Sequence, residues 1–230
     1  MSENHDEGAE KSASYTHIIA LNYFSFLFLT GGGFGCILLT DNMVGAVTYF
    51  ALWLYLLPPL LCRITLFFTG RPTGQVTTDS NTHTLWWWLF QLQLPFNRFP
   101  FIEELLRCVP GLYALWLNLW GGEVSLFAFW SPGVAVMERY HLKIEKGVIL
   151  GSQAFLSGHL ITKQTDGSTL LWVDKIQLDE GALVGARANI GPGCHIHKHQ
   201  TVPFNAVLRS YTEIKDGRKI FKQRSLLQNP

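Results

Sequence analysis

Three histidines alternate along the short stretch CHIHKH, at His195, His197 and His199. Imidazoles bind zinc and exchange protons near neutral pH. In an extended segment His195 and His197 point to the same face, and His199 lies around the next corner. One strand alone spaces such ligands too widely for a compact zinc site, so a metal would need a second chain. We therefore expect no metal, and interpret the three residues as lining an acceptor cleft, a subunit interface or plain surface.

An aliphatic residue returns every six positions around these histidines. The residues in step are Leu178, Val184, Ile190, Ile196, Val202 and Leu208. A helix would repeat every three or four residues and a strand every two, whereas a period of six is typical of parallel β-helices. The same rhythm holds upstream at Ile144, Leu150 and Leu156, and residues 162–175 interrupt it. We expect one stack of coils over 124–214 with one protruding loop.

The composition excludes several classes of protein. Of the 230 residues, 48% are hydrophobic and only 15% are charged, and the formal net charge is +1. No basic stripe with interleaved aromatic residues is present, so we expect no nucleic-acid partner. The four cysteines are far apart and do not indicate a disulfide framework. Residues 1–17 are polar and acidic, which is typical of a disordered tail.

Two uncharged apolar runs, 18–39 and 43–62, precede the repeats, and the second continues past Arg63 to Phe68. Each reaches the roughly 20 residues that span a bilayer. The short linker TDNM between them allows only a hairpin, so 18–68 is expected to be a transmembrane helical hairpin. The alternative is a soluble protein with two buried helices. Arginines follow the second run and none occupies the tip. The positive-inside rule therefore places the repeat domain in the cytoplasm, beneath an inner or plasma membrane.

The segment 69–123 links the hairpin to the repeats. It is rich in Trp and Leu and is broken by three prolines, at Pro95, Pro100 and Pro110. We expect two short helices lying on the membrane, with Trp86, Trp87 and Trp88 in the headgroup layer. A third span at 111–130 is the alternative. The basic residues of the C-terminal tail, 215–230, are expected to be attracted to anionic headgroups.

The repeat motif resembles that of the left-handed β-helix, or hexapeptide-repeat, acyltransferases. A small residue, any residue, an aliphatic residue and often glycine stand here as VILG, ALVG and ANIG, and as CHIH in the same register. The stretches WLNLWGGEV, SGHLITK and LVGARANIGPG are also similar to the membrane-attached terminal segment of nonribosomal-peptide-type and poly-amino-acid synthetases. The implied fold is a left-handed parallel β-helix tethered to a membrane.

This resemblance implies an enzyme that moves an acetyl, acyl or aminoacyl group from a thioester to a hydroxyl or amine. The thioester would be acetyl-CoA, another CoA ester or a carrier-protein ester. The resemblance also implies a homotrimer and no permanently bound cofactor. His159 in SGHLITK matches the position of the family's histidine general base. Candidate groups that assist it are Asp166, Asp174, Glu138, Glu145 and the backbone N–H of Gly158.

Two other functions stay open from the sequence. One is a non-catalytic membrane scaffold that uses the coils only to trimerise. The other is a zinc-dependent hydratase, because the γ-type carbonic anhydrases have a similar fold and bind zinc between subunits.

Overall fold

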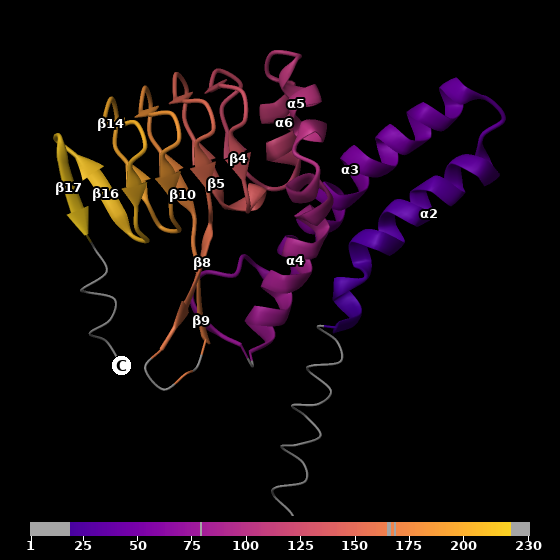
Figure 1. Ribbon diagram of the computed structural model, residues 1–230, viewed down its shortest axis with the longest axis horizontal. Helices are drawn as coiled ribbons and strands as arrows, with labels where there is room; N and C mark the ends of the chain where they lie inside the picture. The colour runs from indigo at the N-terminus through magenta and orange to yellow at the C-terminus, as the bar shows by residue number, and fades with distance from the viewer. Residues whose placement is uncertain (1–18, 79, 165–166, 168, 222–230) are drawn as a thin grey trace, which may run out of the picture.

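The six-residue rhythm forms coils whose short strands stack in three sheets. The computed structural model describes residues 19–78, 80–164, 167 and 169–221. Within this part the coils stack side by side at one end of the molecule, and a helical arm extends from the other end (Figure 1). An N-terminal helical region followed by a β-helix-like stack of parallel strands is thus the observed architecture.

Each coil contributes one strand to each sheet, and neighbouring strands are parallel. Sheet 1 contains β2 (Glu123–Val124), β5 (Leu142–Ile144), β10 (Ile176–Leu178), β13 (His195–Ile196) and β16 (Thr212–Lys215). Sheet 2 contains β3 (Phe129–Trp130), β6 (Ile149–Leu150), β11 (Leu183–Val184) and β14 (Thr201–Val202). Sheet 3 contains β4 (Ala135–Val136), β7 (Phe155–Leu156), β12 (Asn189–Ile190) and β15 (Val207–Leu208).

The aliphatic residues in step point into the coils and form the core. Leu178 pairs with Ile144 on one side and with Ile196 on the other, and all three are buried. Glycine follows the aliphatic residue in several repeats for a steric reason. A Cβ atom at Gly151 or at Gly185 would come within 2.5 Å of a backbone nitrogen in the next coil. The expected rhythm is therefore present in space as a stacked apolar interior.

The corner between sheet 3 and sheet 1 carries extra residues in the first two coils. In the first coil, a short 3-10 helix, η1 (Arg139–His141), precedes β5. In the second coil a hairpin of β8 (His159–Lys163) and β9 (Thr169–Val173) projects from the stack (Figure 1). Strand β1 (Gly74–Thr77) joins β9 in antiparallel register. The interruption of the rhythm thus contains two paired strands, and the first of them begins at His159.

The helical arm is a hairpin of α2 (Phe24–Leu39) and α3 (Met43–Thr69). Asn42 caps α3, since its Oδ1 accepts a hydrogen bond from Gly45 N at 2.8 Å. By length and composition alone, α3 could cross a membrane, whereas α2, at 16 residues, is shorter than the expected first span. Apolar side chains such as Ile37, Met43 and Phe67 are largely exposed on the arm. Such a surface is typical of a segment in contact with lipid or a partner.

The segment between the arm and the coils differs from the expectation of two short interfacial helices. It contains three helices: α4 (Asn81–Arg98), α5 (Phe101–Arg107) and α6 (Leu112–Leu119). Helix α4 runs through Pro95, because a proline in the last turn removes only one intrahelical hydrogen bond. Trp86 is buried in protein contacts, not placed in a headgroup layer. No third span over 111–130 forms, since α6 ends at Leu119 and the first coil follows.

Helix α6 fastens the arm to the coils. Pro59 in α3 cannot donate to the carbonyl of Tyr55, and the Trp116 indole of α6 donates to that oxygen instead, at 2.8 Å. Arg63 of α3 donates to the carbonyl of Asn118 at 2.7 Å. The arm is therefore joined to the first coil by side-chain contacts as well as by the chain itself.

The expected basic tail is partly a strand. β17 (Arg218–Phe221) pairs antiparallel with β16 and covers the end of sheet 1. The amine of Lys219 donates to the carbonyl of Val207 at 3.1 Å, so one of the basic groups is used within the fold. Lys222 and Arg224 lie outside the described residues.

Candidate active site

Glu138 and His159 meet at the corner between sheet 3 and sheet 1. Val136 of the first coil pairs with Leu156 of the second, so the residues that follow these two strands also lie one above the other. Glu138 Oε1 is 2.5 Å from His159 Nδ1. The coil register, not proximity in the sequence, brings the carboxyl group to the ring.

The carboxyl group of Glu138 is sealed in the protein. Its side chain is 0% exposed, and Oε2 has no hydrogen-bond partner among the described residues. Gly158 makes this packing possible, because a Cβ there would lie 3.1 Å from Glu138 Cβ and 3.2 Å from Oε2. Burying an unmatched polar oxygen costs free energy. Among the described residues, Glu138 supplies the carboxyl group that contacts His159, and such a cost at that position favours a functional role over a chance contact.

Aromatic side chains of α4 cover the imidazole of His159. The ring centroid of Trp86 lies 5.2 Å away, and that of Phe90 lies 5.7 Å away in an edge arrangement. The side chain of His159 remains 18% exposed. No hydrogen bond to Nε2 is found in the described part of the chain. The nitrogen remote from Glu138 is therefore available to a substrate group.

A buried network holds the corner in place. The guanidinium of Arg139, next to Glu138, donates to Glu103 Oε1 from Nε at 2.8 Å and to Asn97 Oδ1 at 3.0 Å. Gln93 Oε1 accepts from the Arg139 backbone N–H at 2.7 Å. The other oxygen of Glu103 accepts from Tyr113 at 2.5 Å. Helices α4, α5 and α6 are thus all tied to the residue beside Glu138.

His141 is a second histidine at this corner, but it is not suited to proton transfer. Burial lowers its pKa to about 3, although a hydrogen bond between Nε2 and the Pro72 carbonyl at 2.8 Å opposes this shift. The positive charges of Arg71 and Lys175 lower the pKa further. At neutral pH, His141 is a neutral donor that anchors the segment before β1.

The other assisting residues expected from the sequence lie elsewhere. Asp174 accepts from the Lys175 backbone N–H at 2.7 Å and interacts with the hydroxyl of Tyr211, not with His159. Burial, followed by this carboxylate, raises the pKa of Tyr211. Glu145 accepts from the Glu180 backbone N–H at 3.0 Å. Asp166 lies outside the described residues.

The backbone of Gly158 contributes to the corner in two ways. Its carbonyl accepts a hydrogen bond from Asp174 N at 2.9 Å, which closes the base of the hairpin. Its N–H has no hydrogen-bond partner within the described ranges. The expected role of this N–H as an oxyanion donor remains a prediction.

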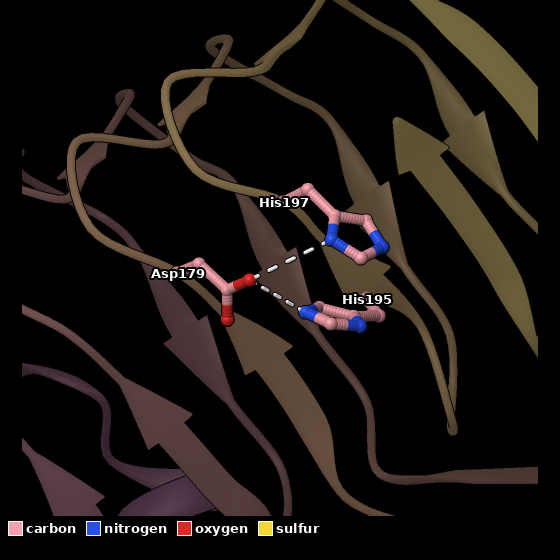
Figure 2. Close-up of side chains that lie close together, drawn as sticks. All are labelled: Asp179, His195 and His197. Atoms are coloured by element: carbon pink, nitrogen blue, oxygen red, sulfur yellow. Dashed lines mark hydrogen bonds and ion pairs between the residues drawn. The ribbon is translucent and has the colours of Figure 1, made fainter. Parts of the chain in front are cut away.

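The three alternating histidines separate into two groups. His195 and His197 lie together with Asp179 on the outer surface of sheet 1 (Figure 2). His199 adopts a left-handed backbone conformation, with φ of 57°, and its ring lies against Gly181. The expectation that the first two share a face is confirmed, since their rings stack at 3.9 Å between centroids.

Two cavities border the described helices. The larger, about 480 Å³, is apolar and is lined by residues of the N-terminal arm and α4, including Phe24, Thr84 and Trp88. The smaller, about 220 Å³, lies beside α6 and β3 and is lined by Tyr113 and Trp130 among others. His159 lines neither of these two cavities.

Comparison with known proteins yields no match to a protein-family model, a curated protein or a solved structure.

Sequence reasoning had placed Glu138 among several candidates and had missed Arg139, Glu103 and Asp179. The sequence carries one signal for Arg139 and Glu103, since an arginine and glutamates in a strongly apolar chain need partners. No sequence signal linked Asp179 to the histidines before the coil register was known.

Proposed function

We propose that the protein is a membrane-associated acyltransferase on a left-handed hexapeptide-repeat β-helix, with His159 as general base. The observation that carries this proposal is the 2.5 Å contact between His159 Nδ1 and the wholly buried carboxyl group of Glu138. A histidine oriented by a buried carboxylate, with its second nitrogen free of hydrogen bonds among the described residues, is the arrangement that proton-abstracting sites use.

The chemistry assigns one role to each nitrogen. When Nδ1 carries the proton and donates a hydrogen bond to Glu138, Nε2 has a free lone pair. Nε2 takes the proton of an acceptor hydroxyl or amine as that group attacks the thioester carbon. The carbon–sulfur bond then breaks, and the thiolate receives the proton back from the imidazolium. The negative charge of Glu138 stabilises the imidazolium between these two steps.

The donor we propose is acetyl-CoA or another thioester, carried by CoA or by a carrier protein. The acceptor would be a hydroxyl or amine on a molecule made at, or delivered to, the membrane. This choice rests on the position of His159 beneath Trp86 and Phe90, which belong to the same helix that packs on the apolar arm. The arm would span the membrane with the coils on the cytoplasmic side.

The proposal includes a homotrimer. The first residues of β3, β6 and β11 form a column on the outer surface of sheet 2, where Phe129, Ile149 and Leu183 pair in register. Their exposed fractions are 61%, 44% and 37%, respectively. An apolar column along a flat side of a prism suits burial against a second copy in a closed ring.

A non-catalytic trimeric scaffold is the second candidate function. One observation favours it, namely that neither of the two cavities described above is lined by His159. In a scaffold the contact between Glu138 and His159 would serve only to close the corner, and no substitution there would change a reaction rate.

The test is thioester turnover by the full-length protein in detergent, with acetyl-CoA and a panel of amines and alcohols. His159→Gln removes the base and keeps a polar side chain of similar size. We expect turnover to fall by roughly 10² to 10⁴, the range that general-base catalysis supplies. His199→Gln is the matched control, because that ring lies at a distant turn. Equal turnover in both variants and the unmodified protein would favour the scaffold.

A further inference from the structure

Two imidazoles on the outer surface of sheet 1 lie between two carboxylates. Asp179 Oδ2 is 2.8 Å from His195 Nε2 and 3.8 Å from His197 Nδ1 (Figure 2). On the other side, the oxygens of Glu213 lie 3.7 Å from His195 Nδ1 and 3.9 Å from His197 Nε2. Each ring therefore presents one nitrogen to Asp179 and the other to Glu213.

We propose that Asp179, His195 and His197 form a binding site for one divalent first-row transition-metal ion. One ligand atom from each residue lies within 4.8 Å of the others. Zinc bonds of about 2.0–2.2 Å in a tetrahedral arrangement place neighbouring ligand atoms about 3.3 Å apart. The distances of 2.8 Å and 3.8 Å from Asp179 lie on either side of this value. Small rotations of the two rings would bring both nitrogens toward one ion.

The groups around these ligands match the support that metal sites need. Gln177 donates to Asp179 Oδ1 at 2.8 Å, which leaves Oδ2 directed toward the rings. Glu213 faces the nitrogen of each ring that does not point to Asp179. These are ion-pair distances, longer than a hydrogen bond, and a carboxylate that closes on the N–H of a metal-bound imidazole fixes its tautomer. Glu213 is therefore a positioning residue for both histidines.

The donor atoms also favour a transition metal. The three residues offer one carboxylate oxygen and two imidazole nitrogens. Two imidazole nitrogens select zinc and its first-row neighbours over magnesium and calcium, which prefer oxygen ligands. The three side chains are partly exposed, at 18–28%, so an ion can reach them from solvent.

The coil register explains how one chain gathers these ligands. His195 pairs with Gln177 and Glu213 across sheet 1, and Asp179 and His197 follow the paired residues Leu178 and Ile196. The segment CHIHKH alone spaces its histidines too widely for a compact site. The neighbouring coil supplies Asp179, and His197 follows the end of β13, so its ring can stack on that of His195. A bound ion would cross-link two coils.

The experiment is a zinc titration of the full-length protein in detergent after removal of metal by a chelator, with a chromophoric competitor for zinc. We expect about one zinc per chain, with three protein ligands and one position left for water. His197→Gln and Asp179→Asn should each weaken binding by roughly 100-fold or more, and Glu213→Gln by roughly 10- to 100-fold. His199→Gln should bind zinc as the unmodified protein does.

A second readout uses the unmodified protein and therefore does not depend on how well the variants fold. Cobalt in place of zinc gives visible absorption bands that report tetrahedral coordination. The unmodified protein should show these bands, and a chelator should remove them reversibly. The proposal is overturned if the unmodified protein takes up no zinc in a saturable manner. It is also overturned if folded His197→Gln and Asp179→Asn variants retain full affinity.

Discussion

Glu138 and His159 lie one above the other at the same corner of two successive coils, with 2.5 Å between Oε1 and Nδ1. Twenty-one positions separate them in the chain, and only the register of β4 with β7 brings them together. The contact links Glu138, which follows β4, to His159, the first residue of the hairpin of β8 and β9. It is the feature on which the proposed base chemistry depends.

Replacing the carboxylate tests its role in orienting the imidazole. Glu138→Gln keeps the size of the side chain but removes the negative charge that stabilises the imidazolium. We expect thioester turnover to fall by a large part of the roughly 10²- to 10⁴-fold that base catalysis supplies. Glu145→Gln is the matched control, since Glu145 contacts the Glu180 backbone at another corner. Unchanged turnover in Glu138→Gln would remove the carboxylate from the mechanism.

The buried His141 predicts a loss of stability in acid. Its pKa is about 3 in the folded protein and about 6.5 when unfolded. Between these values the unfolded state binds a proton that the folded state does not, so stability is complete above pH 6.5 and falls as the pH drops toward 3. The free energy of unfolding changes by up to about 1.4 kcal/mol per pH unit because of this one group.

The His141→Gln variant isolates this contribution. Glutamine can still donate to the Pro72 carbonyl but does not titrate, and all other groups are common to both proteins. Chemical unfolding in detergent at several pH values should give a flatter dependence for the variant. If the free energy of unfolding depends on pH equally in the two proteins, His141 does not govern acid unfolding.

The network around Arg139 predicts a large effect on stability. Arg139→Ala leaves Glu103 buried without its main partner, and breaking such a pair costs about 3–5 kcal/mol. Arg187→Ala is the control, because within the described part of the chain that guanidinium donates to Gln153 alone, in an exposed setting. Thermal unfolding in detergent compares the two. A similar, small shift for both variants would mean that the helices are held to the coils by other contacts.

The apolar column on sheet 2 predicts how the chain assembles. Leu183→Glu introduces a charge into the column and should convert the expected trimer to a monomer, because a charge at a buried interface is strongly unfavourable. Val207→Glu, on the outer surface of sheet 3, should leave the trimer intact. Light scattering in detergent measures both. A monomeric unmodified protein would contradict the trimer itself, and a trimeric Leu183→Glu would place its interface elsewhere.

The sequence predicted the coils well because their signal is local. The six-residue period at Val184, Ile190 and Ile196 predicts which side chains point inward without any knowledge of distant contacts. The helices between the arm and the coils were harder, because Pro95 and the Trp residues suggest a break and a membrane surface. Tertiary packing overrides both signals, since Trp86 is buried against strands that lie far away in the sequence.

The site was predictable only in part. The resemblance around SGHLITK predicts His159 as the base, but four acidic residues are equally plausible partners from the sequence. The choice of Glu138 depends on the number of residues inserted at each corner, which sets the register of the first coil on the second. The coil register also could not be read for Asp179, which reaches the histidines through the stacking of β10 on β13.

The most direct test of the central claim is a double-mutant cycle on turnover with His159→Gln, Glu138→Gln and the double variant. If Glu138 acts only through the imidazole, the double variant should be no slower than His159→Gln alone, because residues that act as a unit are not additive. The account predicts this result together with a loss of roughly 10² to 10⁴ for His159→Gln. Near-normal turnover in a folded His159→Gln variant, or losses that multiply in the double variant, would contradict it.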